Sequence, residues 1–320
     1  MPTLLLDRNA VKTLIRMSEV ISVVEEAFKM YGEGQVSMTA KTYLSLERGD
    51  FRAMSAAIPG CAGVKWVNVH PQNPSLGLPT VMAVLVYSDP ETGYPLAIMD
   101  ATEITAYRTG AAAAIASKHL ARGDSRTVGI IGAGYQARTQ ILALAEFFGP
   151  ISIKAFDISK VAVDRLMSSL PQFSIRSCSI EEAVASDIVC TLTPSLKPIV
   201  KREWIVAGSH INAIGADAPG KQELDPLILK EAIVVVDDLK QASTSGEINV
   251  PIQQGAYSIH EVYATLAEIV SGSKQGRTDC RAITVFDSTG VAVTDIAVAK
   301  LLFEKAQKRG GYQSVELVGT

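Results

Sequence analysis

The chain has 320 residues, 48% of them hydrophobic and 20% charged, which is the balance of a globular protein long enough for two domains. The formal net charge of −3, with no long run of like charges, argues against a nucleic-acid or anionic-membrane partner. The sequence has neither a signal-peptide start nor a membrane-length apolar run, its four cysteines form no CxxC pair and its four histidines lack metal-ligand spacing. We therefore expect a cytoplasmic protein with reduced cysteines in its core and no metal.

The first 120 residues predict helices at both ends and strands between them. Asp7 is expected to cap a short helix, and a second helix follows Ser18 with one apolar stripe and ends at Gly32. Short β-prone runs separated by turn clusters then predict an antiparallel meander. Its expected strands are Thr42–Leu46, Phe51–Ala56, Val64–Val69, Thr80–Tyr87 and Pro95–Met99. An Ala-rich helix from about Thr102 to Leu120 leads out of it.

From Thr127 the pattern alternates between strand and helix, which predicts a parallel doubly wound sheet. The segment from Val291 to Lys308 is expected to form a helix that returns to the first domain. We therefore expect an α/β protein in which residues 120–295 form a Rossmann domain, while residues 1–119 and 296–320 form an α+β domain. The expected strands of the doubly wound sheet are Thr127–Ile131, Ile151–Phe156, Asp187–Leu192, His210–Ile214, Ile233–Val236 and Ile283–Phe286.

The clearest motif is a GxGxxA turn that follows the strand Thr127–Ile131 and opens a helix. Gly132 permits the tight turn, and Gly134 lets the backbone approach a pyrophosphate. Ala137 allows close packing of helix and strand, and the free N–H groups of the helix N-terminus suit phosphates. The motif therefore predicts a dinucleotide-binding site.

An acidic residue at the end of the next strand indicates which dinucleotide is bound. Asp157 lies 25 residues after Gly132, where a carboxylate can bind the ribose hydroxyls. Because a carboxylate there would repel a 2′-phosphate, the sequence favours NAD over NADP.

Lys65 lies on an apolar strand, Gly63-Val-Lys-Trp-Val-Asn-Val69. Alternation places its side chain on the same face as Val67 and Val69. The residue is therefore either an exposed lysine on a solvent-facing strand or a lysine in a cleft with a lowered pKa. Spacing alone favours the first interpretation.

Two arginines and three polar positions are further candidates. Arg52 and Arg108 could each clamp a carboxylate, or could be surface cations. Asp217, Thr193 and Ser288 follow strands whose carboxyl ends would form the cofactor rim. For Asp217 the alternative is a turn-capping role, and for Ser288 it is a helix N-cap.

These motifs together resemble the ornithine cyclodeaminase/μ-crystallin family, and most closely its archaeal alanine dehydrogenase branch. The resemblance covers nearly the whole chain, and its motifs follow one another in a single order along the sequence. It rests on Gly63-Val-Lys-Trp-Val-Asn-Val-His-Pro, Gly77-Leu-Pro-Thr, Asp100-Ala-Thr, Arg108-Thr-Gly-Ala, Gly132-Ala-Gly-Tyr-Gln-Ala, His210-Ile-Asn-Ala-Ile-Gly-Ala-Asp, Pro219-Gly-Lys-Gln-Glu-Leu and Phe286-Asp-Ser-Thr-Gly.

The resemblance implies a homodimer whose first domain forms the substrate pocket and the dimer contact, with a Rossmann domain inserted before the closing helix. It implies that Lys65 is the acid/base group, Arg52 a carboxylate partner and Asp217 a catalytic residue at the substrate. The residues that it places at the dinucleotide are Arg108, Tyr135, Gln136, Asp157, Lys221 and Ser288, alongside Gly132, Gly134 and Thr193 from the strand ends.

The implied activity is an NAD-dependent interconversion of L-alanine, or a similar small L-amino acid, and its 2-oxo acid plus ammonia by hydride transfer at Cα. In this interpretation Arg52, with Lys65 and Arg108 near it, holds the substrate carboxylate. Partial desolvation and the guanidinium charges both lower the pKa of Lys65. The cyclodeaminase branch resembles this chain but has an acidic residue near the Arg52 position, so Arg52 disfavours ornithine. The alternatives are an ornithine cyclodeaminase, a cyclic ketimine (pyrroline- or piperideine-2-carboxylate) reductase, and a non-catalytic ligand-binding protein.

Overall fold

The computed structural model describes residues 2–319 and divides the chain into two compact units. The first unit comprises Met1–Arg108 and Val291–Thr320, and the second comprises Thr109–Gly290. The first division falls inside helix α3 (Thr102–Leu120), not at the end of that helix as the expected boundary at residue 120 implies. Across the described residues, no helix combines the length and the apolar character needed to cross a membrane.

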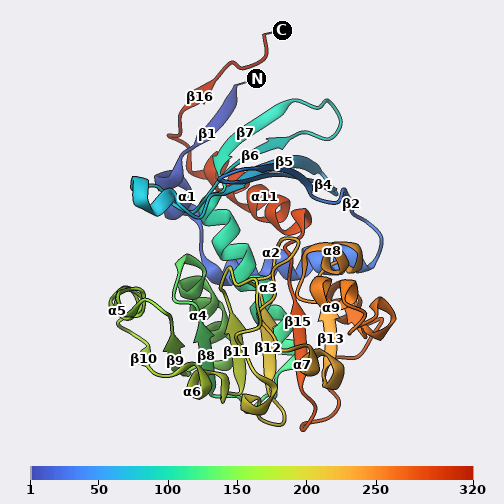
Figure 1. The fold of residues 1–320 in the computed structure, drawn as a ribbon. Coiled ribbons are helices and arrows are strands. Elements are labelled where there is room, and N and C mark those ends of the chain that lie inside the picture. Colours follow the sequence, from blue (N-terminus) through green and yellow to red (C-terminus); the bar gives the residue numbers. More distant parts are fainter. Residues whose placement is uncertain (1, 320) are drawn as a thin grey trace. The chain divides into compact units, whose positions relative to one another are not determined.

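The first unit is built on a mixed sheet, and the predicted meander is confirmed in it (Figure 1). Strands β4 to β7 pair in chain order, each antiparallel to the next. The first strand, β1, extends the sheet by pairing parallel with β7, which the sequence pattern did not indicate. The strands of this unit are β1 (Thr3–Leu6), β2 (Ser37–Met38), β3 (Thr42–Leu46), β4 (Gly49–Ile58), β5 (Cys61–Val69), β6 (Val81–Ser88), β7 (Pro95–Asp100) and β16 (Ser314–Val315).

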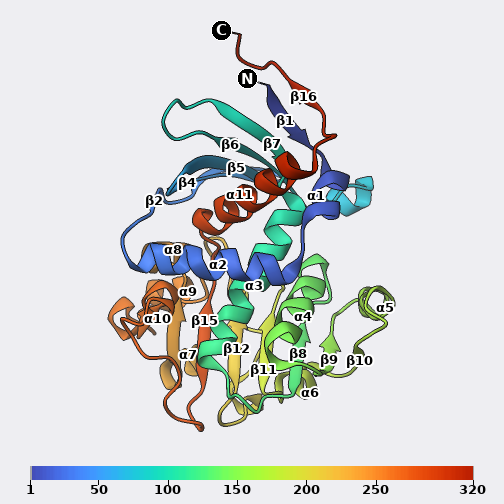
Figure 2. The ribbon, with the colours of Figure 1, turned by 180° about the vertical axis from the view of Figure 1, so that it is seen from behind.

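Helices cover one face of this sheet. Helix α11 (Ala292–Arg309) packs against β4, β5 and β6 and against α2 (Met17–Gly32), as Figure 2 shows from behind. The predicted return of the closing helix to the first domain is therefore confirmed. Asp7 caps α1 (Arg8–Leu14), as expected, by accepting a hydrogen bond of 2.8 Å from the backbone N–H of Ala10. Helix α2 begins at Met17, so Ser18 lies inside the helix and not before it as expected.

The second unit is a parallel doubly wound sheet, as predicted. Its strand order is β10-β9-β8-β11-β12-β15-β13-β14, with every neighbouring pair parallel (Figure 1). The order reverses direction between β8 and β11, so the carboxyl ends of these two strands border the crevice in which such sheets bind ligands. The strands are β8 (Thr127–Ile131), β9 (Ser152–Phe156), β10 (Ser174–Ser177), β11 (Ile188–Thr191), β12 (His210–Ala213), β13 (Ile233–Val236), β14 (Ala264–Thr265) and β15 (Thr284–Asp287).

The core of the second unit follows from burial of both faces of the sheet. Every residue of β11, β12 and β15 is buried, which a parallel sheet covered by helices requires. The helices of this unit, after α3, are α4 (Tyr135–Phe148), α5 (Lys160–Ser169), α6 (Ile180–Val184), α7 (Pro226–Glu231), α8 (Leu239–Ser245), α9 (Asn249–Gln253) and α10 (Leu266–Val270).

The cysteines differ from expectation in their burial. All four are free, but only Cys61 and Cys190 are buried. Cys178 is half-buried and Cys280 is exposed, so the expectation that all four lie in the core is wrong for these two. A thiol is small and only weakly polar, so a loop tolerates it as readily as a core does.

Candidate active site

The glycine turn of the second unit has the geometry that its sequence predicts. Gly132 has φ +98°, a conformation that favours glycine, and a Cβ there would lie 3.0 Å from Cγ2 of Thr193. Its N–H donates a 2.8 Å hydrogen bond to the carbonyl of Phe156 at the end of β9. The turn is therefore wedged between the ends of β9 and β11 and has no room for a side chain at Gly132.

The surroundings of Gly134 fit a dinucleotide. A Cβ at Gly134 would meet no atom within 4 Å, so space is open directly above the backbone. Gly134 is also the N-cap of α4, and no side chain caps that helix. The helix dipole favours an anion at this end of α4, beside Tyr135 and Gln136. Open space and an uncapped helix end are what a bound pyrophosphate requires.

Asp157 lies beside this turn and takes part in holding it. One carboxylate oxygen accepts a 2.8 Å hydrogen bond from the N–H of Ala133, and the other accepts a 2.7 Å bond from the N–H of Ser159. Each oxygen keeps a further lone pair for a ribose hydroxyl. The sequence reasoning assigned Asp157 only to the ribose and missed its structural contact with the glycine turn.

The carboxyl ends of the other strands carry the remaining predicted residues of this unit. Asp217 and Lys221 form an ion pair of 2.6 Å. The backbone N–H and the hydroxyl of Thr193 each donate a 2.7 Å hydrogen bond to Glu223. Ser288 is buried, and its hydroxyl lies 3.3 Å from Asp237, to which it donates. The alternative N-cap role of Ser288 is wrong, because α11 begins after Val291 without a side-chain cap.

In the first unit the predicted lysine is buried and not exposed. Lys65 on β5 is 0% exposed, so its interpretation as a solvent-facing strand lysine is wrong. Its Nζ donates a 2.7 Å hydrogen bond to Oδ2 of Asp295, in the first turn of α11. The other oxygen of Asp295 accepts a 3.1 Å bond from Nε of Arg108, which is also buried. One buried carboxylate therefore bridges two cations.

Burial is the main reason for the unusual acidity of this lysine. Burial lowers the pKa of Lys65 from 10.5 to about 7, Asp295 opposes the shift, and the charge of Arg108 adds to it. Of the two causes expected from the sequence, desolvation is the largest, and Arg108 supplies the guanidinium contribution, whereas Arg52 is not among the causes. A lysine with a pKa near neutrality can exist in both protonation states at the working pH, as an acid/base group must.

Arg52 is likewise buried, so its interpretation as a surface cation is wrong, as it is for Arg108. Arg52 and Lys65 lie on the same face of the sheet, since Arg52 pairs with Val67 and Met54 pairs with Lys65. The guanidinium binds Asp50, with an Nε–Oδ1 distance of 2.7 Å, and lies 5.3 Å from the ring centre of Tyr43. Asp50, which the sequence reasoning did not single out, therefore offsets part of the Arg52 charge.

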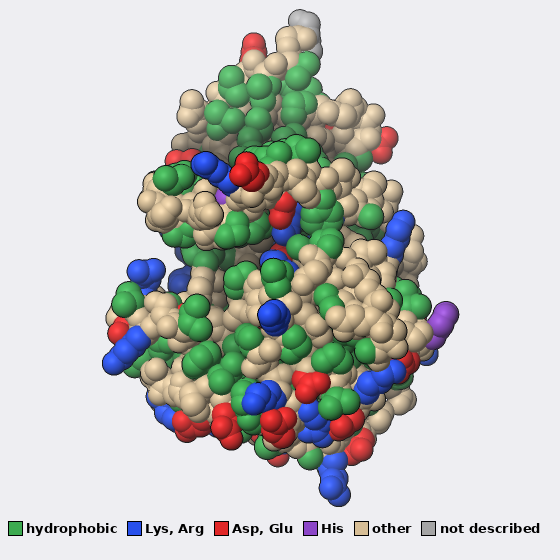
Figure 3. Space-filling view, viewed as in Figure 1, with side chains coloured by type: hydrophobic (Ala, Val, Ile, Leu, Met, Phe, Trp, Pro, Cys, Tyr) green, Lys and Arg blue, Asp and Glu red, His purple; other side chains and the backbone are tan. Residues whose placement is uncertain are grey.

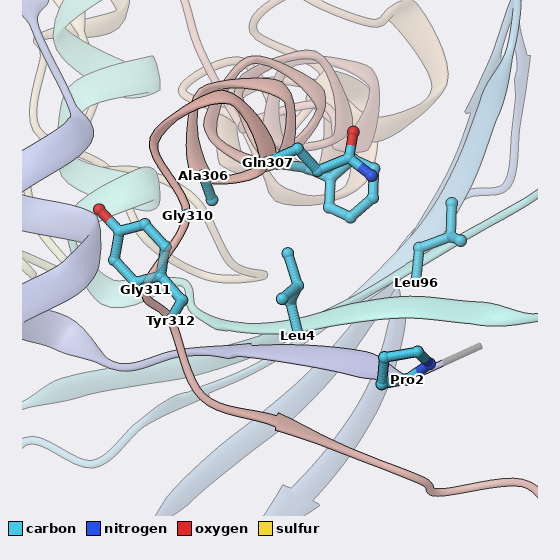
Figure 4. A pocket seen from close by; sticks show the side chains of 9 residues that line it. Pro2, Leu4, Leu96, Ala306, Gln307, Gly310, Gly311 and Tyr312 are labelled. Atoms are coloured by element: carbon cyan, nitrogen blue, oxygen red, sulfur yellow. The ribbon is translucent and has the colours of Figure 1, made fainter.

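A pocket elsewhere in the first unit lacks this chemistry. It lies between β1, β7 and the end of α11, and Leu4, Leu96, Ala306 and Tyr312 surround it in Figure 4. Its described lining residues include no carboxylate, no basic side chain and none of the predicted site residues.

The doubly wound sheet, the glycine turn and the acid after β9 define a dinucleotide-binding α/β protein. More specifically, the chain belongs to the ornithine cyclodeaminase/mu-crystallin family, whose sequence profile matches residues 1–310. The resemblance noted from the sequence motifs is confirmed by this match.

Individual relatives are similar over almost the whole chain. An alanine dehydrogenase of Archaeoglobus fulgidus is 51% identical over 309 residues, which is 96% of each chain. The solved structure of an archaeal alanine dehydrogenase dimer with bound NAD has a TM-score of 0.97 and 48% identity, covering 99% of this chain and 100% of the other. The Delta(1)-pyrroline-2-carboxylate reductase of Thermococcus litoralis, solved with NADH and L-proline, has a TM-score of 0.93 and 38% identity, covering 97% and 99%.

Proposed function

We propose that the protein is an NAD-dependent oxidoreductase that interconverts L-alanine, or a similar small L-amino acid, and its 2-oxo acid plus ammonia. The observation that carries the proposal is the buried Lys65, whose pKa is about 7 and which is bound to Asp295 in the same unit as Arg52 and Arg108. The 51% identity to an alanine dehydrogenase supports the choice of substrate.

The side chains of the first unit suit recognition of an amino acid. Arg52 and Arg108 are guanidinium groups, which bind carboxylates through paired N–H donors. Neutral Lys65 takes a proton from the substrate ammonium or from an attacking water, and charged Lys65 returns a proton in the reverse reaction. Asp217 in the second unit orients the water that hydrolyses the imine. We assign the substrate to Arg52, Lys65 and Arg108 on these grounds.

The second unit supplies the cofactor residues in this proposal. NAD, held by these residues, would supply the acceptor for the hydride from the substrate Cα. The turn at Gly132 and Gly134, with the amides of Tyr135 and Gln136, holds the pyrophosphate. Asp157 binds the ribose hydroxyls and selects NAD. The remaining residues that we assign to the dinucleotide are Thr193, Lys221, Ser288 and, from α3, Arg108.

A cyclic ketimine reductase is the second candidate, because the similar Thermococcus litoralis reductase was solved with L-proline. The charge argument against ornithine is weaker than the sequence alone implied. Asp50 neutralises part of the Arg52 charge and could itself accept a second ammonium. Arg52 therefore disfavours ornithine less than an unpaired arginine would.

One set of assays separates these functions. Purified protein is mixed with NAD and, in turn, L-alanine, L-ornithine and L-proline, and NADH formation is followed by absorbance while products are identified. The proposal expects NADH, pyruvate and ammonia from L-alanine. Proline formed from ornithine without net NADH would indicate a cyclodeaminase, and preferred NADH formation with L-proline would indicate a ketimine reductase. NADH binding without turnover of any of them would indicate a ligand-binding protein.

The homodimer that we propose would use the face of the first sheet opposite α11. On that face Phe51 stacks on Trp66 with ring centres 5.2 Å apart, and Trp66 pairs across the strands with Val84. Leu44, Trp66 and Val84 are 53%, 46% and 49% exposed, respectively. Hydrophobic side chains also gather on the upper part of Figure 3, where the first unit is drawn. Contiguous exposed apolar surface of this kind marks interaction sites, and the similar alanine dehydrogenase was solved as a dimer.

Two further expectations stay predictions. Acidic and basic side chains intermingle on the lower part of the face in Figure 3, which is consistent with the absence of a nucleic-acid partner. The cytoplasmic location stays a prediction, and free cysteines are consistent with a reducing compartment.

A further inference from the structure

A loop in the second unit is closed by a hydrogen bond between its two ends. The loop runs from Gly215, just after β12, to Glu223, and it carries the ion pair of Asp217 and Lys221. The N–H of Gly215 donates a 2.9 Å hydrogen bond to Oε2 of Glu223. Donor and acceptor are eight positions apart in the sequence, so the loop between them is held as a closed ring.

The other oxygen of Glu223 ties this ring to the neighbouring strand end. Oε1 accepts 2.7 Å hydrogen bonds from both the N–H and the hydroxyl of Thr193, which follows β11. Thr193 borders the glycine turn, because its methyl group lies 3.0 Å from where a Cβ of Gly132 would be. One carboxylate therefore joins the ends of β11 and β12 next to the turn.

The backbone of Glu223 is itself anchored. Oε1 of Glu247 accepts hydrogen bonds of 2.9 Å from the N–H of Glu223 and 2.7 Å from the N–H of Leu224. Glu247 in turn donates from its N–H to Asp287, at the end of β15, with a distance of 2.8 Å. These hydrogen bonds thus extend across the carboxyl edge of the sheet to a third strand.

Glu223 is completely buried, and burying a carboxylate costs free energy unless hydrogen bonds replace water. Burial raises the pKa of Glu223, and the donors on Thr193 and Gly215 act against that shift. Within the part of the chain that the structure describes, the Glu223 carboxylate accepts hydrogen bonds from three donors, which is the role of an ionised acceptor. An apolar side chain would avoid the cost of burial but could not join the strand ends.

We propose that Glu223 is a positioning residue, whose carboxylate clasps residues 215–223 and Thr193 so that Asp217 and Lys221 keep a fixed place at the cofactor edge. The inference rests on the proposed function for what Asp217 and Lys221 do there. Glu223 is not expected to touch either substrate or dinucleotide.

The variant Glu223→Gln tests the clasp with little change in shape. Because both the Thr193 and the Gly215 backbone N–H groups need an acceptor, a glutamine amide must present its NH₂ group to one of them. One end of the clasp therefore opens whichever way the amide turns. Thr193→Val removes only the hydroxyl donor and leaves both backbone bonds, so its effect should be smaller.

A matched control is Glu268→Gln. Glu268 accepts hydrogen bonds from the N–H and the hydroxyl of Thr265, at 2.8 and 3.0 Å, as Glu223 does from Thr193. It lies in α10, next to the edge strand β14, away from the glycine turn. Each variant is assayed by NADH titration, by hydrogen exchange of the peptide 210–225, by kcat and KM, and by thermal melting.

Glu223→Gln should speed exchange in the peptide 210–225, raise the Kd for NADH, and lower kcat by on the order of tenfold or more, as misplacement of about 1 Å can do. Glu268→Gln should change none of these beyond its effect on melting. The binding and exchange measurements do not depend on the substrate, so they test the clasp even if L-alanine is not oxidised. Wild-type exchange and NADH affinity in Glu223→Gln, or equal effects in Glu268→Gln, would overturn the proposal.

Discussion

The Nζ of Lys65 lies 2.7 Å from Oδ2 of Asp295, and both side chains are withdrawn from solvent. The contact joins a strand of the meander to the closing helix, and Arg108 completes it from α3. Breaking a buried pair by removing one partner leaves an uncompensated charge, which costs about 3–5 kcal/mol in general. A buried lysine with a neutral-range pKa in such a setting is typical of an acid/base group more than of a structural one.

Lys65→Ala should abolish most turnover of L-alanine, by on the order of 10²-fold or more, because a positioned acid/base group is lost. Binding of NADH should change little, since the glycine turn and Asp157 belong to the other unit. Steady-state kinetics and fluorescence titration with NADH measure the two effects separately.

Lys65→Arg serves as the companion variant. A guanidinium keeps a positive charge but stays protonated, so it cannot accept a proton and should not restore turnover. Near-normal turnover in Lys65→Ala would leave Asp217 as the candidate acid/base group.

Asp295→Asn should move the pH profile of alanine oxidation towards lower pH. In the wild type, kcat/KM should rise with pH through the Lys65 pKa of about 7, because only the neutral amine accepts a proton. The Asp295 carboxylate favours the charged ammonium and so raises this pKa, and removing it lowers the pKa further. The pH dependence of kcat/KM measures the shift.

The control for Asp295→Asn is Glu103→Gln, which removes another carboxylate of the same unit, the one bound by Arg8. That variant should leave the midpoint of the profile in place. If the midpoint for Asp295→Asn is unchanged or rises, the role assigned to the Lys65–Asp295 pair is contradicted.

Asp157→Ser should shift cofactor preference towards NADP, because the charge that repels a 2′-phosphate is removed. We expect the ratio of kcat/KM for NAD to that for NADP to fall by on the order of tenfold, which corresponds to about 1.4 kcal/mol. Affinity for NAD should fall as well, because Asp157 also holds the N–H of Ala133. If the wild type already uses NADP at least as well as NAD, the role given to Asp157 is wrong.

The features predicted well from the sequence are those whose signal is local. The glycine turn, the strands on either side of it and Asp157 fall within about 30 residues, where periodicity and glycine geometry decide the structure. The meander was predictable for the same reason, since each strand is followed by its own turn cluster. The strand Thr3–Leu6 was missed because its partner, β7, is far along the chain and three leucines show no alternation.

The environment of Lys65 could not be predicted in this way. Its partner Asp295 is 230 residues away in sequence, and an acid in the first turn of a helix ordinarily indicates only favourable helix-dipole electrostatics. Alternation shows which face of β5 carries Lys65, but not that α11 covers that face. Glu223 was missed because the role proposed for it depends on a donor at Thr193, after another strand, and on a donor at the far end of its own loop, Gly215.

Trp66→Glu should weaken the proposed dimer. It places a charge in the middle of the exposed apolar face, where it would have to be desolvated on association. Light scattering after size exclusion should show a smaller species than the wild type. Lys160→Glu, an exposed change in the second unit, is the control and should leave the assembly unchanged. An unaltered dimer in Trp66→Glu would place the contact on another face.

Asp50→Asn should increase discrimination against ornithine relative to alanine. The Asp50 carboxylate binds Arg52 at 2.7 Å and offsets its charge, so removing the carboxylate makes the surroundings of Arg52 more cationic. A substrate with a second ammonium is then repelled more strongly, while the carboxylate of alanine is attracted at least as well. The measurement is the ratio of kcat/KM for L-alanine to that for L-ornithine, with products identified.

Arg52→Met tests the same pair from the other side. Losing the guanidinium should raise the KM for L-alanine and leave Asp50 as an unpaired acceptor in the pocket, so the ratio should move towards ornithine. If the ratio moves in opposite directions in the two variants, the Arg52–Asp50 pair discriminates between substrates by their charge. If the ratio moves in the same direction in both variants, they act through the fold of β4 alone. Rapid formation of proline from ornithine by the wild type would favour the cyclodeaminase alternative over alanine oxidation.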